Sequence, residues 1–379
     1  MTRVKLGEVA RESKLRDDGR KPLPSVGLEH LDSGDVTLRR WDEGGSNTFT
    51  KRFLPGQVLF GRRRAYLQKA AVAPFEGLCS GDIITVEAIP GAIHERLLPF
   101  VIQNPSLFDF AVGKSAGSLS PRVKWGKLAE FDFDLPEMAE QQELADILWT
   151  AEGVKEHYRS LIKSSDDLVK SQFVEMFGAL GSDGSKFNKV RLDSIAQTRL
   201  GKMLDKKQQT GEHPAHYLAN HNVQWFRFDF DELETMDFTD DDREEFALHD
   251  GDLMMCEGGE VGRCAIWHNQ LEECYFQKAI HRIRCNTDIV LPEYLAWHFK
   301  IAADDGLLVK HTNASTIAHL SGVKLKALQI VLPPIDVQRE FVRFSNQVDK
   351  SKFALQKSLD DLDAMAKKLM NEELGLGNV

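Results

Sequence analysis

The order of apolar and polar positions predicts two sets of short strands, one in each half of the chain. Runs of apolar and β-branched residues bounded by Gly, Pro or Asp predict strands at 57–60, 70–73, 82–87 and 131–135. The same pattern recurs at 252–256, 264–267, 279–284 and 328–332. One shorter helix is predicted in each half, at 95–111 and at 292–302. This order of elements predicts two α+β lobes.

Each lobe is followed by a long segment whose apolar residues recur at spacings of three and four. In the first segment they are Leu144, Ile147, Ala151, Val154, Tyr158, Leu161, Ser165 and Leu168. In the second they are Phe341, Phe344, Val348, Ser351, Leu355, Ser358, Leu362 and Met365. A spacing of this kind, sustained over several heptads, predicts a coiled coil in which these residues form the helix–helix or subunit interface. Two separate amphipathic helices, each lying on its own lobe, are the alternative.

The two halves are copies of one unit. A shift of 197 residues places 118–178 on 315–375 without a gap. It aligns twelve identical residues, namely Ser118, Lys127, Leu128, Leu135, Pro136, Gln141, Glu143, Lys155, Asp166, Lys170, Glu175 and Gly178. Both copies contain Leu-Pro followed after four residues by Gln, and then the long helix. Upstream segments match at slightly shorter shifts, so loops of different length separate equivalent elements. The repeat predicts two similar domains.

The patterns divide the chain of 379 residues into a lobe at 1–136, a helix at 137–178, a second lobe at 179–333 and a second helix at 334–379. The composition, 42% hydrophobic and 28% charged, is typical of globular domains with sizeable cores. Neither a membrane span nor a signal peptide is predicted, because no apolar run is long enough. Five Cys, an odd number without a CxxC pair, favour a reducing compartment. We therefore predict a cytoplasmic protein.

The formal net charge of −10 disfavours binding of nucleic acid by the chain as a whole. The charge is unevenly distributed, however. Residues 1–136 carry 20 Lys and Arg against 17 Asp and Glu, whereas residues 229–245 carry ten acids against one Arg. Both lobes can therefore present basic faces to a polyanion, and we expect the acidic stretch to lie off any such face.

The sequence contains none of the catalytic motifs for which we searched, including the phosphate-binding loop, the amino-methyltransferase tetrad and the nuclease constellation. Buried thiols are favoured over a zinc site, because finger spacing is absent among Cys256, Cys264, Cys274, Cys285, His268 and His281. The Gly-rich segment 258–262 can cradle a phosphate or form a turn with positive φ. The sequence therefore indicates a binding protein that has neither catalytic nor metal-ligating residues.

Two lobes, each closed by Leu-Pro, a Gln and a long helix, resemble the specificity (S) subunit of type I restriction–modification systems. The resemblance covers essentially the whole chain. It is carried most specifically by 251–267, 275–284 and 315–334, with 115–136 as the first-lobe equivalent of the last segment. The stretches 201–207 and 220–225 are also typical of such subunits.

The resemblance implies two target-recognition domains, at 1–136 and 179–333, that each read one half of a bipartite asymmetric DNA site. The helical spacers at 137–178 and 334–379 are then expected to pair as an antiparallel coiled coil. A non-catalytic subunit of this kind docks two methyltransferase (M) subunits for adenine methylation, and restriction (R) subunits join them for cleavage. S-adenosylmethionine, Mg and ATP are expected on those partners, and no cofactor is expected on this chain.

Polar and basic side chains on loops are the candidates for DNA contacts, since cations on phosphates fix the register and contacts to base edges read the sequence. In the first lobe the candidates are Arg62, Arg63, Arg64, Lys114, Ser115, Ser118, Arg122 and Lys124. In the second lobe they are Lys202, Lys206, Lys207, Asn220, Gln277, His281, Arg282, Lys310, Thr312, Ser315 and Thr316. Structural hydrogen bonds are an equal alternative for Gln277 and His281. Glu257 either accepts from a cytosine or belongs to a turn, and Arg282 and Arg284 are expected to share one strand face.

Two other classes of function stay open at this point. One is a single-chain restriction or modification enzyme, which would transfer methyl groups without partners. The other is a scaffold whose two lobes bind proteins, which would lack the steep salt dependence of phosphate contacts. The sequence does not indicate the recognised bases or the spacer between the half-sites.

Overall fold

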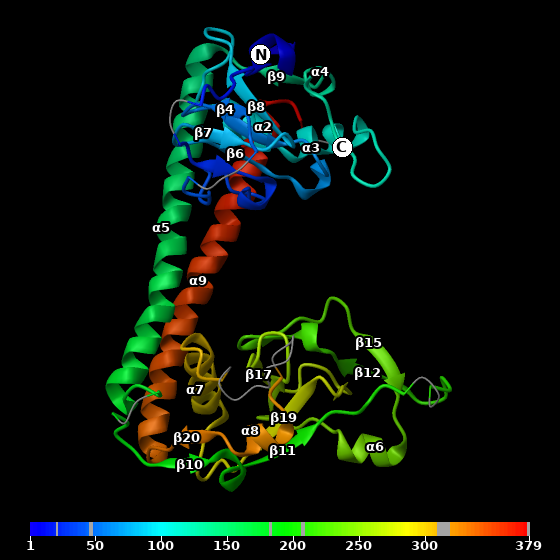
Figure 1. Cartoon of the computed structure of the whole chain (residues 1–379), viewed down its shortest axis with the longest axis vertical. Coiled ribbons are helices and arrows are strands. Elements are labelled where there is room, and N and C mark those ends of the chain that lie inside the picture. Colours follow the sequence, from blue (N-terminus) through cyan, green and yellow to red (C-terminus); the bar gives the residue numbers. More distant parts are fainter. Residues whose placement is uncertain (20–21, 45–47, 182–183, 206–208, 309–318, 377–379) are drawn as a thin grey trace. The chain divides into compact units, whose positions relative to one another are not determined.

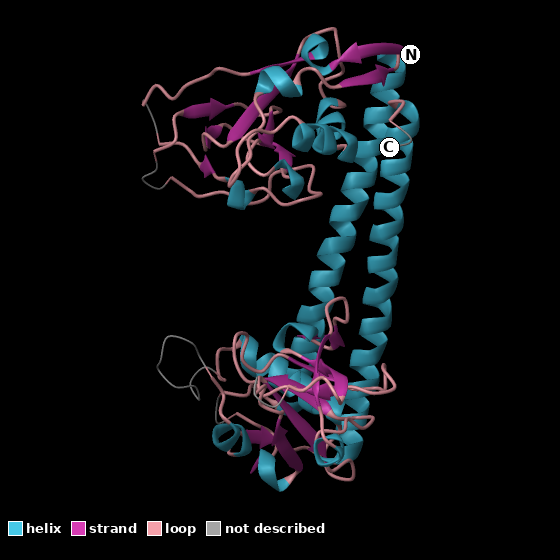
Figure 2. Cartoon of the chain, turned by 90° about the vertical axis from the view of Figure 1, so that its right-hand side faces the viewer, coloured by secondary structure: helices cyan, strands magenta, loops and turns pink. Residues whose placement is uncertain are grey.

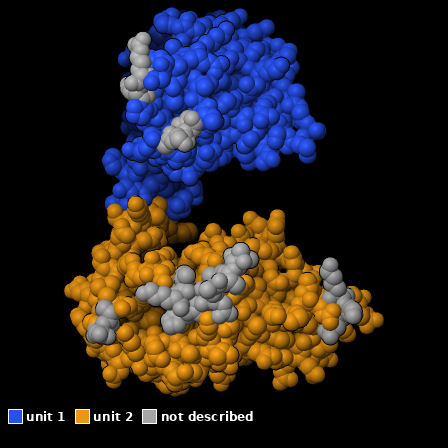
Figure 3. Space-filling model, in the orientation of Figure 1, with its two compact units in different colours: residues 1–161, 354–379 blue, residues 162–353 orange. Residues whose placement is uncertain are grey.

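The computed structural model describes residues 1–19, 22–44, 48–181, 184–205, 209–308 and 319–376. The chain forms two compact units (Figure 3). Unit 1 comprises residues 1–161 and 354–379, and unit 2 comprises residues 162–353. Each unit therefore holds one lobe and a stretch of both long helices. None of the described helices has the length and apolar character needed to cross a membrane.

The lobe of unit 1 is built on a four-stranded antiparallel sheet in the order β2-β8-β5-β6. Its strands are β2 (Ala10–Glu12), β5 (Val58–Gly61), β6 (Ala70–Val72) and β8 (Ile83–Ala88). A three-stranded sheet contains β3 (Ser25–Val26), β7 (Gly77–Cys79) and β4 (Lys51–Phe53), and a two-stranded sheet contains β1 (Thr2–Lys5) and β9 (Asp132–Leu135). Val58 and Phe60 enter one hydrophobic core and Leu59 enters another. Burial on both faces explains why β5 has a continuous apolar sequence.

Short helices contribute to the core that contains Val58 and Phe60. They are α1 (Leu6–Val9), α2 (Leu98–Gln103), α3 (Pro105–Gly113) and α4 (Trp125–Leu128), together with the 3-10 turn η2 (Ala65–Leu67). A second 3-10 turn, η1 (Leu28–His30), packs against the core that contains Leu59. The single helix expected at 95–111 is wrong, because it is broken between α2 and α3. Pro105 lacks an N–H donor, and the Asn104 side chain caps α3 by accepting from the Ser106 N–H at 2.9 Å.

The lobe of unit 2 repeats this topology with its own strands. Its four-stranded sheet has the order β11-β19-β16-β17, with β11 (Ala196–Leu200), β16 (Leu253–Cys256), β17 (Cys264–Ile266) and β19 (Ile280–Cys285). A three-stranded sheet contains β15 (Glu234–Asp237), β12 (Pro214–Leu218) and β18 (Tyr275–Phe276). One two-stranded sheet contains β10 (Lys189–Arg191) and β20 (Gln329–Val331), and another contains β13 (Val223–Gln224) and β14 (Arg227–Phe228). Its shorter helices are α6 (Asp240–Glu245), α7 (Pro292–Asp304) and α8 (Gly322–Lys326), with 3-10 turns η3 (Leu192–Ser194) and η5 (Asn220–Asn222). The predicted repeat is confirmed in two sheets, since β2-β8-β5-β6 and β1-β9 correspond to β11-β19-β16-β17 and β10-β20. The three-stranded sheets differ, because β4 pairs with β7 in unit 1 whereas β15 pairs with β12 in unit 2.

The shared Leu-Pro and Gln have a structural reason. The buried Gln141 amide donates to the Pro136 carbonyl at 2.9 Å, and its oxygen accepts from the His94 N–H at 2.8 Å. Gln338 makes the same bonds in unit 2, to the Pro333 carbonyl at 2.9 Å and from the Leu291 N–H at 2.9 Å. In each unit one glutamine therefore ties the start of a long helix to the lobe.

The long helices are α5 (Met138–Phe177) and α9 (Ile335–Glu373), and they pack together (Figures 1 and 2). Within unit 1 the Lys155 ammonium lies 2.7 Å from the Asp363 carboxylate. Within unit 2 the rings of Phe173 and Phe341 lie 5.4 Å apart. The later residues of α5 thus meet the earlier residues of α9, so the helices are antiparallel. The predicted α+β fold with two similar lobes and a pair of long helices is confirmed.

The helix seam differs from the predicted one in half of its positions. The predicted seam has two positions in each heptad, and the position that contains Leu144, Phe341 and Val348 is correct, since these residues are buried. The other set is shifted by one residue: Leu148, Lys155 and Val169 are buried on α5, and Ser345 and Leu359 on α9. Ile147, Leu161 and Leu168 are about half exposed, at 50%, 51% and 51%, and Met365 is 68% exposed. The apolar pattern favoured Val154 over Lys155, because it could not show that a lysine is buried against carboxylates.

Candidate nucleic-acid interface

Three loops of unit 1 meet at the end of β5 and form what we call the three-loop junction, residues 62–64, 80–82 and 120–123. The Arg62 N–H donates to the Asp82 carbonyl at 2.9 Å, and the Val123 N–H donates to the Arg62 carbonyl at 3.0 Å. The Arg64 N–H donates to the Pro121 carbonyl at 2.9 Å. The structure therefore brings together two basic loops that were separate candidates in the sequence, Arg62 to Arg64 and Lys114 to Lys124.

Asp82 neutralises part of the positive charge of this junction. The Arg122 Nε lies 2.7 Å from one carboxylate oxygen and the Arg63 Nη1 lies 3.0 Å from the other. The hydrogen bond from Arg122, together with its charge and those of Arg63 and Arg62, lowers the pKa of Asp82. Arg64 is exposed, and its side chain has no ion pair or hydrogen bond among the described residues. Of the cations expected on this loop, Arg63 is therefore held by the Asp82 carboxylate, whereas Arg64 is directed to solvent.

The remaining unit 1 candidates lie near the C-terminus of α3 and on the loop after it. The Lys114 ammonium lies 5.3 Å from the centre of the Phe110 ring, and the Ser115 hydroxyl donates to the Ala111 carbonyl at 2.8 Å. Ser118 and Lys124 are exposed. Beside them Leu119 is 90% exposed, so this loop presents a large apolar side chain together with polar ones.

Unit 2 has the same three-loop junction with different side chains, formed by residues 257–259, 277–279 and 319–320. The Glu257 N–H donates to the Ala279 carbonyl at 2.9 Å, and the Leu320 N–H donates to the Glu257 carbonyl at 2.8 Å. The backbones of Arg63 and Arg122 form an isolated antiparallel β-bridge in unit 1, and those of Gly258 and His319 form the equivalent β-bridge in unit 2. The backbone geometry is shared, whereas Arg62 and Arg63 are replaced by Glu257 and Gly258.

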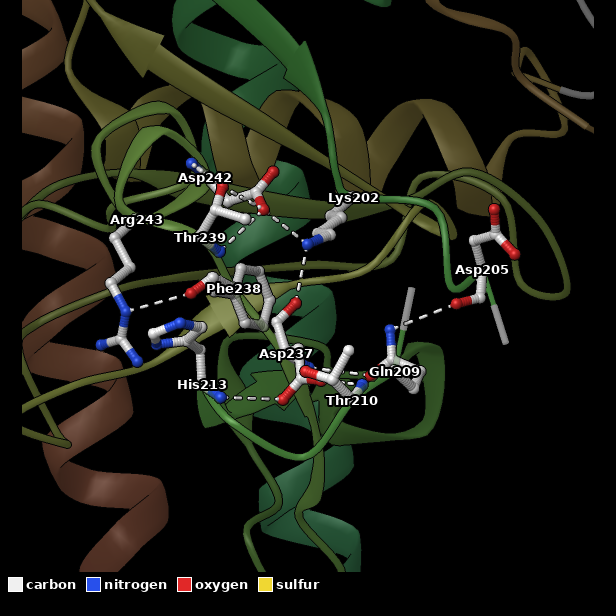
Figure 4. Close-up of polar contacts among 10 residues, drawn as sticks. All are labelled: Lys202, Asp205, Gln209, Thr210, His213, Asp237, Phe238, Thr239, Asp242 and Arg243. Atoms are coloured by element: carbon white, nitrogen blue, oxygen red, sulfur yellow. Dashed lines mark hydrogen bonds and ion pairs between the residues drawn. The ribbon is translucent and has the colours of Figure 1, made fainter. Parts of the chain in front are cut away.

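Several unit 2 candidates are engaged by internal partners. The Lys202 ammonium lies 2.7 Å from the Asp237 carbonyl oxygen and 2.6 Å from the Asp242 carboxylate, over the Phe238 ring (Figure 4). The buried His281 ring lies 3.1 Å from the Leu320 carbonyl, and burial lowers its pKa. Arg282 donates to the Ala247 carbonyl at 2.7 Å, as Arg284 does at 3.3 Å. Arg282 and Arg284 therefore share a face, as expected, and both side chains are half-buried against Ala247.

The other unit 2 candidates are differently placed. The Asn220 amide N–H donates to the Gly258 carbonyl at 3.4 Å, while its side-chain oxygen is buried without a hydrogen bond among the described residues. Gln277 lies in the junction, and its backbone N–H donates to the Leu218 carbonyl at 3.1 Å. Six candidates lie outside the described residues: Lys206, Lys207, Lys310, Thr312, Ser315 and Thr316. Contacts between any of these candidates and DNA stay predictions.

Part of the acidic stretch has a structural role that its composition did not reveal. The Asp237 carboxylate accepts from the backbone N–H of His213 at 3.1 Å (Figure 4) and from that of Gly211 at 2.7 Å. These bonds, with the Gly211 N–H contributing most, lower the pKa of Asp237. Asp242 holds Lys202 and caps α6 together with Thr239. The stretch thus organises the lobe locally through buried or half-buried carboxylates.

Four of the five cysteines are buried side chains of the unit cores. Cys79, Cys256, Cys264 and Cys274 are buried, and none of the five is disulfide-bonded. Burial raises the thiol pKa of each, to about 12 for Cys274 and Cys285. The predicted burial is confirmed for Cys256, Cys264 and Cys274, whereas Cys285 is half-buried. Thiols with a raised pKa are poor nucleophiles at neutral pH.

The sequence search missed Asp82, Tyr66 and Gln68. Asp82 joins two arginines, and Tyr66 and Gln68 lie on the turn that begins at Arg64. The available signal was the repeat, because the strands on either side align the segment 62–68 with 257–262. The internal alignment would have marked 62–68 as a loop whose length and side chains differ between otherwise similar lobes.

Comparison with known proteins gives one family. A family model described as the type I restriction modification DNA specificity domain matches residues 184–361. The type I restriction enzyme EcoDI specificity subunit of Escherichia coli is 22% identical over 139 residues, which are 36% of this chain and 31% of that protein. The chain therefore matches about a third of the length of this curated relative.

Two solved structures cover nearly the whole chain. A chain from a structural study of complex assembly and conformational transition of the type I R-M system has a TM-score of 0.57 and 17% identity, covering 98% of this chain and 97% of that one. The type I restriction–modification S subunit from M. genitalium has a TM-score of 0.55 and 12% identity, covering 98% and 96%. At these identities the likeness shows the fold. Residues 184–361 therefore carry a type I restriction modification DNA specificity domain, and the chain as a whole has the fold of the solved type I S subunit.

Proposed function

We propose that the chain reads a bipartite, asymmetric DNA site, with one half-site read by each lobe. The observation that carries the proposal is the repeated three-loop junction. Equivalent backbone hydrogen bonds, such as Arg62 to Asp82 and Glu257 to Ala279, support different side chains in the two units. A constant backbone with variable side chains is what two readers of unrelated base sequences require, because bases are read by side-chain donors and acceptors.

The charge of the two junctions fits readers with different targets. In unit 1 the junction carries Arg62, Arg63, Arg64 and Arg122 against one carboxylate, Asp82. Cations in this number suit phosphates and guanine edges. In unit 2 the equivalent loop starts with Glu257, a group that accepts hydrogen bonds and suits the amino group of cytosine. The two half-sites are therefore expected to differ, which makes the whole site asymmetric.

The long helices are the proposed docking surface for two methyltransferase (M) subunits. Ile147 and Leu161 on α5 and Met365 on α9 are apolar, exposed and outside the helix seam. Exposed apolar side chains on a helix pair are typical of a surface that another protein covers. Restriction (R) subunits join the complex in this proposal, and the partners carry S-adenosylmethionine, Mg and ATP. The chain itself supplies specificity without catalysis and works in the cytoplasm.

A salt titration of DNA binding tests this proposal. The chain in complex with its methyltransferase subunits is titrated with duplex DNA at several salt concentrations. Phosphate contacts make the logarithm of the affinity fall linearly with the logarithm of the salt concentration, by about one unit of slope per contact. We expect a steep slope that becomes shallower in an Arg62, Arg63, Arg64→Ala variant.

The matched control is Arg40→Ala, which removes an exposed arginine that is paired with Asp32 and lies outside the three loops. It is expected to leave the slope near the wild-type value. Binding without salt dependence would instead favour a scaffold for protein ligands. A triple variant with the wild-type slope would show that the 62–64 loop does not face the DNA.

A further inference from the structure

The turn between β5 and β6 holds two non-glycine residues in the left-handed backbone region. Arg64 has φ 55° and ψ 57°, and Gln68 has φ 49° and ψ 47°. They flank η2, the 3-10 turn Ala65–Leu67. Residues with a Cβ atom rarely adopt this conformation, because Cβ crowds the following carbonyl oxygen. Two such residues at the ends of a single turn are therefore a strained arrangement.

Unit 2 has an equivalent turn that is one residue shorter and carries no such strain. The turn is closed by the Gly61 N–H to Lys69 carbonyl bond in unit 1 and by the Cys256 N–H to Arg263 carbonyl bond in unit 2, both at 2.8 Å. Counted from these bonds, Arg64 corresponds to Gly259, with φ 75°, and Gln68 corresponds to Gly262, with φ 90°. Glycine is the unstrained choice at both places. Unit 1 thus has side chains where the fold accepts glycine.

Arg64 and Tyr66 are exposed and Gln68 is half-buried, and all three lie on a backbone held by hydrogen bonds. The Arg64 N–H donates to the Pro121 carbonyl at 2.9 Å. The N–H groups of Leu67 and Gln68 donate, also at 2.9 Å, to the carbonyls of Arg64 and Ala65, respectively. Ala65 is only 2% exposed and anchors the turn in the unit 1 core. Tyr66 is 55% exposed. The side chains of Arg64, Tyr66 and Gln68 make no hydrogen bond or ion pair with any residue in the described ranges, so no internal polar contact explains them.

We propose that the turn Arg64–Gln68 is a specificity-determining element of the first lobe, with Arg64 reading a guanine and Gln68 an adenine. This inference rests on the proposed DNA-reading function and assigns the base contacts within it. A guanidinium donates two hydrogen bonds to the O6 and N7 atoms of guanine, and a glutamine amide pairs with the N6 and N7 atoms of adenine. A backbone held in place before binding limits the entropy that these contacts cost. Strain retained at a surface turn fits a functional role.

The alternative is that the turn only needs left-handed backbone, and that its side chains are incidental. Glycine variants separate the two explanations. If the side chains are incidental, Arg64→Gly and Gln68→Gly relieve strain and change nothing else. If they read bases, the same variants keep or raise the Tm of the chain but lose recognition of one half-site. Stability and recognition therefore move independently.

Arg64→Lys separates base reading from phosphate binding. It keeps the positive charge and the Cβ atom but loses the two-pronged guanidinium. The wild-type complex with its methyltransferase subunits is first used to map the modified site, and duplexes are then made with each base pair of that site replaced. For wild type we expect a loss of about tenfold or more when the guanine read by Arg64 is replaced.

We expect Arg64→Lys to bind the intact site about tenfold more weakly, to lose discrimination at that guanine alone, and to keep the salt slope. Gln68→Gly should lose discrimination at one adenine of the same half-site. Unchanged discrimination in both variants would overturn the proposal, and so would a phosphate-like result in which Arg64→Lys matches wild type and Arg64→Gly only flattens the slope. A wild-type complex that modifies no defined site would overturn the DNA-reading function itself, which is a separate outcome.

Discussion

Lys155 and Asp363 form an ion pair of 2.7 Å between the two long helices, and the equivalent residues of the repeat form a second ion pair. The shift of 197 residues carries Lys155 onto Lys352 and Asp166 onto Asp363. Lys352 and Asp166 are themselves paired, within unit 2. The two pairs are therefore one interaction made twice with the roles of the helices exchanged. This reciprocity is what a pairing of two equivalent helices requires.

The ion pair should contribute to the stability of unit 1. The Lys155 side chain is only 4% exposed and also pairs with Glu152, so its removal leaves half-buried carboxylates without their cation. We expect Lys155→Ala to lower the free energy of unfolding by about 1–3 kcal/mol. The control is Lys170→Ala, whose pair with Asp305 is more exposed and should contribute less than about 1 kcal/mol. Denaturant unfolding compares them, and equal losses would contradict a special role for Lys155.

The first half of the chain should dimerise. A fragment of residues 1–178 contains both Lys155 and Asp166 but lacks α9, which leaves the Leu144 and Val169 side of α5 uncovered. A second copy offers the same partners, so an isologous dimer with two Lys155–Asp166 pairs is expected. With methyltransferase subunits this dimer should modify an inverted repeat of the first half-site.

Light scattering at micromolar concentration measures the association of this fragment. Lys155→Asp in the fragment places carboxylates against Asp166 and should weaken the dimer by tenfold or more. A wild-type fragment that stays monomeric would contradict the shared register, as would a dimer that modifies the original asymmetric site.

Gln141 should be essential to the attachment of α5. Gln141→Ala leaves the His94 N–H and the Pro136 carbonyl without their partner in a buried site. The expected loss is about 2–4 kcal/mol of unfolding free energy, measured by chemical denaturation. Gln142→Ala is the control, because its exposed neighbouring side chain should cost less than about 0.5 kcal/mol. A similar small loss for both variants would disprove this role for the Leu-Pro and Gln motif.

Asp237 should make unit 2 sensitive to acid. Its pKa in the folded chain is lowered by backbone N–H groups, whereas the unfolded value is about 3.9. The stabilising contribution is therefore complete above roughly pH 5 and is lost as the pH falls through the folded pKa. Asp237→Asn should lower the Tm at pH 7, with the difference from wild type closing at acid pH. Asp231→Asn, at an exposed position, should follow wild type throughout. A gap that stays constant with pH would contradict the carboxylate's role.

The fold was largely predictable because its strongest signals are local. The apolar runs of β5, β8, β16 and β19 and the periodic helices α5 and α9 were predicted close to their observed bounds. The break at Asn104 was missed because the apolar pattern continues across Pro105. The seam was misplaced at Lys155 and Ser345 because polar residues are buried there, satisfied by Asp363 and by the Val342 carbonyl. Such burial depends on partners that are distant in sequence.

The site was less predictable, because residue type does not show which way a charge faces. Arg64 and Arg63 are neighbours in sequence, yet only Arg63 is held by Asp82. Lys202 and Arg282 are basic residues of the type that binds DNA, but Lys202 donates to the Asp242 carboxylate and Arg282 donates to the Ala247 carbonyl. The left-handed backbone of Arg64 and Gln68 has no signature in composition. The repeat was the one feature that pointed to the junction from sequence.

The central claim is that two lobes with one backbone plan and different side chains read two different half-sites. Sequencing that maps methylated adenines in a host that expresses the chain with its methyltransferase subunits tests it most directly. We expect one asymmetric motif of two specified half-sequences separated by an unspecified spacer, and a change confined to one half-sequence when Arg64 is replaced. A single contiguous motif, two identical half-sequences in the wild type or an Arg64 variant that alters both halves would contradict it.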